Sequence, residues 1–326
     1  MNEFFSVFPG EWDGFDAENN VNLKKALDAL RHSKYHQATD LSVAAVESAG
    51  DDAIGKAKAL SLKASFDILK GDVAAADAAL AESLNLNEKD SNALIKLALV
   101  HLEKNDFIEM THALERSYNL NPANPALFYH RGEVLALSGS LQAAVKDFEE
   151  AEKLCPNFEI AYVHHARGLL GLNNPDEAEQ VLLKALERFK DSVEIRNALG
   201  EVYVWKKDFR LAEKTFNEIL ASKPKSPQVQ LNLSLLKMTE NNNVKGAEQH
   251  LKKALEIDPT FEAAHLQLAN LMISCDRNDE AMKQFDSAIK HARSLQELTS
   301  VYSLKLASLV QLKCIERFPN LAEKLK

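Results

Sequence analysis

The stretch from Phe128 to Pro156 decides the fold and reads FYHRGEVLALSGSLQAAVKDFEEAEKLCP. Apolar and small residues recur at helical spacing on both sides of Gly139, which indicates two helices joined by a turn at that glycine. Gly132 and Ala144 are small, so we expect the two helices to approach each other closely there. Pro156 is expected to end the second helix, because proline cannot continue the backbone hydrogen bonds.

The same pattern recurs along most of the chain. Repeat-final positions are separated by 34, 34, 34, 34, 35 and 34 residues, and the extra residue is assigned to the turn Asn241-Asn242-Asn243. These positions are Glu88, Pro122, Pro156, Lys190, Pro224, Pro259 and Arg293. A small residue opens the second helix of every unit except one, where Met110 replaces it. A 34-residue period of two antiparallel helices is the tetratricopeptide pattern.

We therefore predict an all-α fold, a right-handed superhelix (solenoid) of tetratricopeptide helix pairs over residues 21–326. About eight pairs are expected, because a weaker pair over residues 22–48 precedes the seven regular repeats. A longer helix that begins near Ser294 should cap the C-terminal end. Terminal repeats are expected to be atypical, since they must cover an apolar face with a more polar outer side.

Residues 1–20 are expected to form an aromatic linker or cap. The segment FFSVFPGEW, residues 4–12, contains four aromatic side chains that fit no helical or strand period. Four exposed aromatic residues would favour aggregation, so we expect them to pack against the first repeats.

Composition and charge restrict the function. The net charge is −9 and the chain has no basic stripe, which argues against nucleic-acid binding. Cys155, Cys275 and Cys314 are far apart and lack CxxC spacing, so we expect small buried residues in a reducing compartment. No apolar run reaches the length of a membrane span and no signal peptide opens the chain, so the chain as given is expected to be soluble.

The sequence contains no recognisable catalytic or metal-binding motif. His164 and His165 are adjacent, and neighbouring helical residues point about 100° apart, so the two cannot ligate one metal ion. A packing or surface role is expected for both. Phosphate-binding glycine loops, nucleophile elbows and HExxH are absent. We predict no catalytic residue, no metal site, no cofactor and no enzyme activity.

A solenoid of helix pairs offers a concave wall formed by the first helix of each repeat. Counting from the start of each repeat, wall residues should come mainly from positions two, five, nine and twelve. Many are aliphatic, which means either that the wall is buried or that it receives an apolar peptide. Polar residues among them could orient a bound backbone. The predicted peptide-binding residues are Tyr129, Glu133, Val163, Arg167, Asn197, Glu201, Trp205, Leu231, Leu266 and Asn270.

Several stretches of the chain resemble a known family. FYHRGEVLALSGSLQAAVKDFEEAEKL, DEAEQVLLKALERF and the ending from Asn278 look like the C-terminal, preprotein-binding region of the seventy-kilodalton import receptor family of the fungal mitochondrial outer-membrane translocase (TOM complex). The opening FFSVFPGEW is similar to the segment with which that region begins, so we expect it to be a mid-protein junction. The resemblance covers nearly the whole chain, and the Tyr129–Gly132 stretch and the two ends make it specific.

The resemblance implies a receptor on the cytosolic face of the mitochondrial outer membrane. It would bind internal hydrophobic targeting signals of preproteins, such as inner-membrane carriers, and pass them to the other translocase subunits. Family members also carry a membrane anchor and a clamp for the acidic tails of chaperones. The repeats that form this clamp resemble one another in having Lys at position five and Asn at position nine. No repeat here has that pair. We therefore expect both the membrane anchor and the clamp to be absent from this chain.

The sequence leaves two further questions open. The alternative function is a general tetratricopeptide scaffold that holds one dedicated protein partner. A homodimer is also compatible with the sequence.

Overall fold

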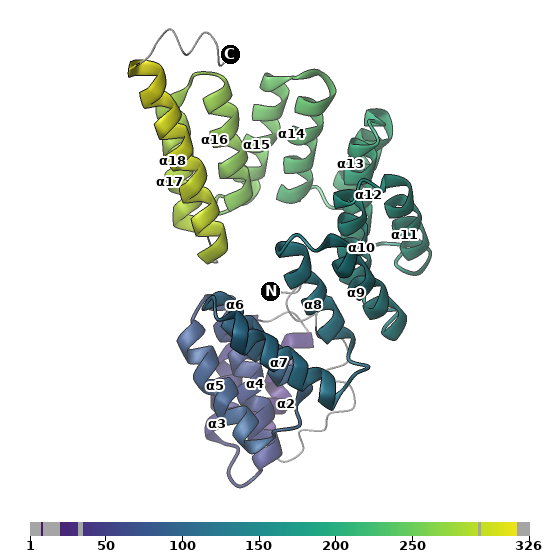
Figure 1. Cartoon of the computed structure of the whole chain (residues 1–326), viewed down its shortest axis with the longest axis vertical. Coiled ribbons are helices and arrows are strands. Elements are labelled where there is room, and N and C mark those ends of the chain that lie inside the picture. The colour runs from purple at the N-terminus through teal and green to yellow at the C-terminus, as the bar shows by residue number, and fades with distance from the viewer. Residues whose placement is uncertain (1–7, 9–19, 32–34, 293–294, 318–326) are drawn as a thin grey trace. The chain divides into compact units, whose positions relative to one another are not determined.

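The computed structural model describes residues 8, 20–31, 35–292 and 295–317, and these contain seventeen α-helices and no strand. The predicted all-α fold is therefore confirmed for this part of the chain (Figure 1). The helices are α2 (Val21–Arg31), α3 (Tyr35–Glu47), α4 (Ala53–Lys70), α5 (Val73–Leu86), α6 (Ser91–Glu103), α7 (Phe107–Leu120), α8 (Pro125–Leu137), α9 (Leu141–Leu154), α10 (Glu159–Gly171), α11 (Pro175–Arg188), α12 (Val193–Trp205), α13 (Phe209–Ser222), α14 (Pro227–Asn241), α15 (Val244–Ile257), α16 (Glu262–Ser274), α17 (Asn278–His291) and α18 (Leu295–Arg317).

The helices follow one another as pairs in the order that the sequence period predicts. The first helices of the pairs are α2, α4, α6, α8, α10, α12, α14 and α16, and α18 follows the last pair. The C-cap residues of the second helices from α5 onward are Asn87, Asn121, Cys155, Phe189, Lys223, Asp258 and Ala292. Each immediately precedes a repeat-final residue, so the chain leaves the helix where the sequence register ends.

Side-chain capping explains where many helices begin. Asp52, Asp72, Asp90 and Asp106 each accept a hydrogen bond from a backbone N–H in the first turn of the helix that follows. Such a bond satisfies one of the four N–H groups that the start of a helix leaves without a partner. Short acidic residues therefore mark several boundaries that the apolar period alone places less sharply.

In each described turn between paired helices, one residue adopts a left-handed backbone. From α4 onward these residues are Gly71, Asn105, Gly139, Asn173, Lys207, Asn242 and Asp276, all with positive φ. The turn predicted at Gly139 has φ +81°. The 35-residue interval falls between Lys207 and Asn242, and α14 has 15 residues where α12 and α16 have 13. The additional residue is thus accommodated before the turn closes.

The close approach predicted at Gly132 is confirmed. A Cβ atom on this residue would lie 2.8 Å from Cε1 of Phe148 on the paired helix α9. Ala144 and Phe148 are buried in the same core. The small side chain is required because the Phe148 ring lies directly against the α8 backbone.

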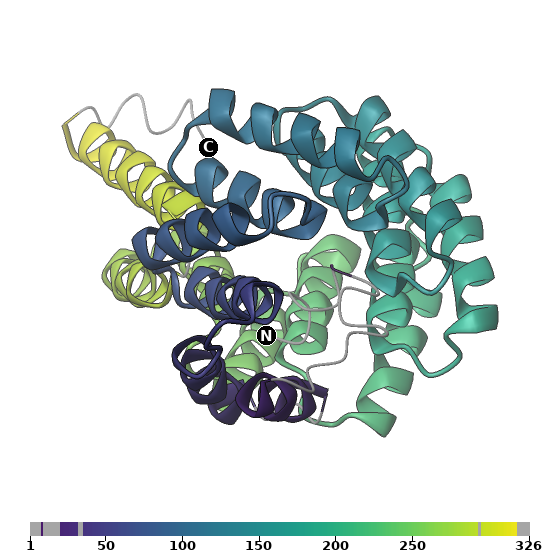
Figure 2. The ribbon, with the colours of Figure 1, turned by 90° about the horizontal axis from the view of Figure 1, so that it is seen from below.

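The chain divides into two compact units, residues 1–195 and 196–326, and each is considered by itself. In the first unit, α4 contacts α6, α6 contacts α8 and α8 contacts α10, so first helices of neighbouring pairs lie side by side (Figure 2). We call the surface that these helices share, and its counterpart on α12, α14 and α16 in the second unit, the first-helix face.

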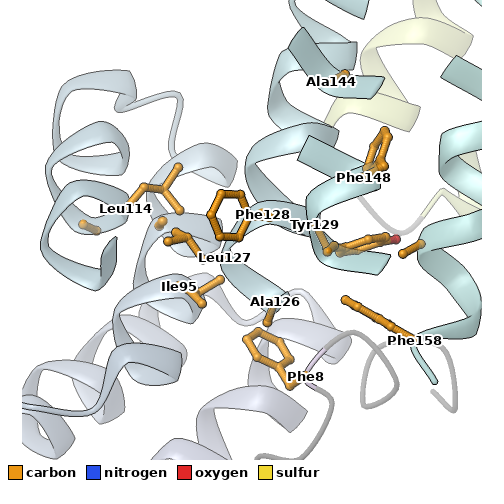
Figure 3. Close-up of a cluster of buried hydrophobic side chains, with 14 of the residues drawn as sticks. Phe8, Ile95, Leu114, Ala126, Leu127, Phe128, Tyr129, Ala144, Phe148 and Phe158 are labelled. Carbon is orange, nitrogen blue, oxygen red and sulfur yellow. The ribbon is translucent and has the colours of Figure 1, made fainter. Parts of the chain in front are cut away.

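Of the four aromatic residues in the opening segment, only Phe8 lies within the described residues. Its side chain is buried in a core cluster with Ile95 and Ala98 of α6 and Leu127 of α8 (Figure 3). The expected packing of an N-terminal aromatic on the repeats is therefore seen for Phe8. Its ring lies against Lys96 of the third helix pair and His130 of the fourth.

The last helix covers part of the final pair. Val301 of α18 is fully buried in a cluster with Ala269, Phe285 and Ala288, which come from α16 and α17. Within the described part of the chain, no helix combines the length and apolar character that crossing a bilayer requires.

The cysteines differ from the prediction of small buried residues. Cys155 and Cys275 are free and only half-buried, because each occupies a C-cap position where the chain leaves α9 or α16. The side chain of Cys314 lies outside the described residues.

Candidate functional site

The predicted binding residues lie at three different depths on the first-helix face. Arg167, Trp205 and Asn270 are exposed, and Glu133, Glu201 and Leu266 are half-buried. Tyr129, Val163, Asn197 and Leu231 are buried, with exposed fractions of 2 to 6%. The buried four can support a binding surface, but their side chains offer almost no area to a ligand.

In the first unit, Tyr129 and Glu133 of α8 belong to a polar cluster that continues onto α10. The Tyr129 hydroxyl donates to Oε1 of Glu133 at 3.1 Å and lies 3.3 Å from Nε2 of His164. Nδ1 of His130 lies 2.9 Å from the other carboxylate oxygen of Glu133. Tyr129 also packs against the rings of Phe148 and Phe158, so the cluster has an aromatic base (Figure 3).

The cluster fixes the charge of Glu133. Burial by itself would raise the pKa of this carboxyl, but the His130 hydrogen bond, the nearby imidazoles and the Tyr129 hydroxyl together lower it. Burial also lowers the pKa of His164, and Arg167 and His130 lower it further against the opposing effect of Glu133. At neutral pH the site therefore holds a carboxylate beside a neutral imidazole.

In the second unit, Asn197 and Glu201 of α12 form an equivalent cluster with Asn232 of α14. The Asn197 amide donates to Oε1 of Glu201 at 3.0 Å. The Asn232 amide donates to Oδ1 of Asn197 at 2.9 Å and to Oε1 of Glu201 at 3.1 Å. Both asparagines are buried and Glu201 is half-buried, so the two amides hold a carboxylate at the edge of the face.

A third pair completes the series. Nζ of the fully buried Lys96 on α6 donates to Oγ of Ser61 on α4 at 3.0 Å. The pairs Ser61–Lys96, Tyr129–His164 and Asn197–Asn232 each join residues 35 positions apart, which is one repeat plus one residue. We call these three pairs the polar tiers.

Apolar residues occupy the same repeat position between the polar tiers. Ile95, Val163 and Leu231 lie one repeat after Ser61, Tyr129 and Asn197, and all three are buried. Polar and apolar side chains thus alternate at position five from Ser61 to Leu231, and the last repeat, with Leu266, departs from the alternation. Sequence reasoning missed Lys96, His164 and Asn232 as tier partners, and the signal that finds them is the 35-residue spacing from a polar residue at position five.

The adjacent histidines face different neighbours. His164 lies against Tyr129, whereas Nδ1 of His165 lies 2.8 Å from Oε1 of Glu152 on α9. Both side chains therefore have packing and hydrogen-bonding roles, as predicted. Among the described residues, no group of three or more His, Cys, Asp or Glu side chains could hold a metal ion.

The arrangement is suited to binding. Glu133 and Glu201 each present a carboxylate that neighbouring donors hold in place. Such a group can accept a hydrogen bond from a peptide N–H or attract a cationic side chain. The exposed Arg167 can donate to a carbonyl or carboxylate, and the indole of Trp205, which is 52% exposed, offers apolar contact area.

Comparison with known proteins places the chain among tetratricopeptide repeats. Two sequence profiles described as tetratricopeptide repeat match it, one over residues 169–236 and 238–302 and the other over residues 111–157. These matches cover more than half of the chain and include Tyr129, Glu133, Asn197, Glu201 and Asn232. The tiers Tyr129–His164 and Asn197–Asn232 therefore involve residues of the matched repeats.

The chain is also similar to a mitochondrial protein. It is 22% identical to human mitochondrial import receptor subunit TOM70 over 321 residues, covering 94% of this chain and 52% of that protein. It is 26% identical to the same receptor subunit of Saccharomyces cerevisiae over 269 residues, covering 80% of this chain and 43% of that protein. The chain thus spans about half the length of the curated relatives it matches.

A solved structure shows the same fold. The crystal structure of yeast Tom70 matches with a TM-score of 0.70 and 24% identity, covering 99% of this chain and 71% of that one. The likeness extends over both units and confirms the predicted solenoid fold class.

Proposed function

Because the chain belongs to the tetratricopeptide repeat family, we propose that it acts as a binding module, and specifically as the preprotein-binding part of a mitochondrial import receptor. The observation that carries this proposal is the similarity to TOM70 along 94% of the chain. The module would work on the cytosolic face of the mitochondrial outer membrane. It would bind internal hydrophobic targeting signals, such as those of inner-membrane carriers, and pass them to other translocase subunits.

The first-helix face supports binding of an extended apolar segment. Each unit by itself presents a half-buried carboxylate beside a polar tier, Glu133 in the first unit and Glu201 in the second, to which backbone N–H groups of a segment bound to that unit would donate. Arg167 would contact its carbonyl groups. In the second unit, the exposed Trp205 and Leu235 and the half-buried Leu266 offer apolar area for its side chains. Asn270 adds an exposed amide that can both donate and accept.

The same face does not favour acidic chaperone tails. Position five carries Ser, Ile, Tyr, Val, Asn or Leu, and never Lys. No repeat therefore combines Lys at position five with Asn at position nine. Near Tyr129 and Asn197 the face presents the carboxylates of Glu133 and Glu201, which repel an acidic tail. We propose that this chain binds preproteins without holding such a tail itself.

An array of overlapping peptides from a mitochondrial carrier and from an unrelated cytosolic protein tests the proposal. We expect selective capture of apolar carrier segments. Arg167→Ala should weaken capture at least several-fold, while Lys146→Ala, which removes an exposed charge from the second helix α9 of the same unit, should not. Equal capture of both peptide sets would contradict the receptor function and favour a scaffold for one dedicated partner.

A further inference from the structure

The side chain of Phe8 occupies a slot on the first-helix face of the first unit. Phe8 belongs to no helix, yet its side chain is only 3% exposed. It belongs to one buried cluster with Ile95 of α6 and with Ala126 and Leu127 of α8, and Ala126 lies beside its ring (Figure 3). We call the space that these residues form, together with Lys96 and His130, the aromatic slot.

The slot provides specific contacts to a ring. Nζ of Lys96 lies 5.0 Å from the centroid of the Phe8 ring, which is within the range of a cation–π interaction. The His130 ring lies 5.0 Å from it at an interplanar angle of 37°. Lys96 is fully buried and donates a hydrogen bond to Ser61. An aromatic ring over this ammonium therefore replaces part of the solvation that burial removed.

The place of the slot in the series of tiers is informative. It lies at Ile95, which occupies the position held by Ser61 and Tyr129 in the neighbouring polar tiers. Ile95 cannot accept a hydrogen bond from His130, the residue 35 positions later. Nε2 of His130 is buried, and within the described residues it has no hydrogen-bond partner. At the slot, an apolar residue thus replaces the polar residue of a tier, and an aromatic ring packs where a hydrogen-bonded pair lies in the neighbouring repeats.

We propose that the aromatic slot is a binding site for a phenylalanine or similar aromatic side chain of a bound apolar segment, and that Phe8 fills it as an internal competitor. Within the described residues the walls are built by the repeats, whereas the ring belongs to residue 8, which precedes the first helix. A ring on another chain would make the same contacts. This inference rests on the proposed function only for the identity of the segment that competes with Phe8.

Competition within one chain has a quantitative consequence. A ring carried on the same chain competes at a high effective concentration, which can reach roughly millimolar. An external segment of equal intrinsic affinity must exceed that concentration to displace Phe8, so removing the Phe8 ring should raise the apparent affinity of the external segment. Lys96 should make the slot prefer an aromatic over an aliphatic side chain, because an ammonium is attracted to a ring face.

A peptide taken from the chain itself provides the probe. The full chain with Phe8→Ala is titrated with the nonapeptide FFSVFPGEW and with FFSVAPGEW, which keeps the other aromatic residues. We expect the first peptide to bind the variant at least tenfold more tightly than the second, and the unchanged protein to bind both weakly. A folded Phe8→Ala variant, judged by circular dichroism, that binds the two peptides equally or binds neither would overturn the slot.

A second variant tests the recognition chemistry and covers a failure of Phe8→Ala to fold. Phe8→Leu keeps most of the apolar contact, and it should bind FFSVFPGEW more tightly than the unchanged protein does. Adding Lys96→Met should abolish the preference for FFSVFPGEW over a peptide with leucine at the central position. If that preference persisted, the ring would not be recognised through Lys96 and the proposed chemistry would be wrong.

Carrier-derived peptides then separate this inference from the proposed function. If Phe8→Ala raises their capture, both are supported. If the Phe8→Ala variant binds FFSVFPGEW but captures no more of the carrier segments than the unchanged protein does, competition between Phe8 and preproteins is overturned. If neither protein captures carrier segments while the variant binds FFSVFPGEW, the slot is supported and the receptor function fails.

Discussion

Asn232 on α14 donates a hydrogen bond of 2.9 Å to Asn197, which lies 35 residues earlier on the first helix of the preceding pair. The same Asn232 amide also reaches Glu201. This contact joins two repeats through buried polar atoms, whereas most of the packing between repeats is apolar. Each polar tier thus joins two neighbouring first helices, and the tiers at Tyr129 and Asn197 also hold a carboxylate, Glu133 or Glu201, on the surface that those helices share.

Asn232→Leu should destabilise the second unit. The change leaves the buried Oδ1 of Asn197 without this donor, and an unsatisfied buried polar atom costs about 1–3 kcal/mol. Urea denaturation followed by circular dichroism measures the difference. Gln249→Ala, at an exposed position on α15 of the same unit, should change stability by less than about 0.5 kcal/mol. Equal stability of Asn232→Leu and the parent would show that the tier contributes nothing to folding.

Gly132→Val should destabilise the first unit through overpacking. The new Cβ would meet Phe148 at 2.8 Å, and extra methyl groups in a packed core cost about 1–3 kcal/mol. Thermal unfolding should show a lower Tm. Leu137→Val, at an exposed position on the same helix, is the matched control and should have little effect. Combining Gly132→Val with Phe148→Leu should recover part of the loss, and no recovery would mean that Phe148 is not the residue obstructed.

Lys207→Gly should stabilise the second unit. Lys207 has φ +61° in the turn after α12, where the equivalent residues are glycine, asparagine or aspartate. A left-handed backbone costs a residue with a Cβ about 1–2 kcal/mol, and the greater freedom of glycine in the unfolded chain offsets roughly half of this. We expect a net gain of about 0.5–1 kcal/mol in urea denaturation.

The matched control for this change is Lys214→Gly. Lys214 is exposed within α13, where glycine should cost about 1 kcal/mol because it weakens the helix. The two substitutions replace the same residue type by glycine and should change stability in opposite directions. If both destabilised the protein, the left-handed turn would not be strained by lysine.

Acidification should destabilise the first unit partly through His164. The folded pKa of this residue is lowered from its ordinary 6.5, mainly by burial. Below pH 6.5 the unfolded chain therefore binds a proton more readily than the folded one does. The contribution of His164 to stability is then present above this pH and is lost as the pH falls toward the folded pKa. The carboxyl of Glu133, whose folded pKa is also lowered, adds a loss in the same direction at lower pH.

Urea denaturation at pH 7.5 and pH 5.5 tests this titration. His164→Gln should lose less stability between the two values than the parent does, because glutamine does not titrate. His112→Gln, which removes an exposed histidine from α7, should retain the parent pH dependence. An identical loss in the parent and in His164→Gln would contradict the lowered pKa.

Much of the fold follows from local sequence signals. The 34-residue period indicates that each helix pair buries an apolar side against the next. The small residue Gly132 indicates that α8 closely approaches the Phe148 ring. The left-handed turn at Gly139 was similarly predictable, since glycine readily adopts positive φ. Lys207, at the same place in another repeat, carried no such signal.

The candidate site was predictable only in outline. Repeat numbering places Tyr129, Glu133, Asn197 and Glu201 on the first helices, but it does not give the depth of each side chain. Tyr129 and Asn197 are covered because the following repeat brings His164 and Asn232 against them. Exposure depends on that neighbour, and periodicity within one helix does not describe it.

The sequence by itself therefore determined the class of element, the register of the repeats and which helices form a common face, because these depend on residues close together in the chain. Only the tertiary structure decided which polar residues meet as tiers, which expected binding residues are buried, and that the Phe8 ring lies between α6 and α8. Those contacts join residues at least one repeat apart, and they arise from the offset with which one helix pair packs on the next.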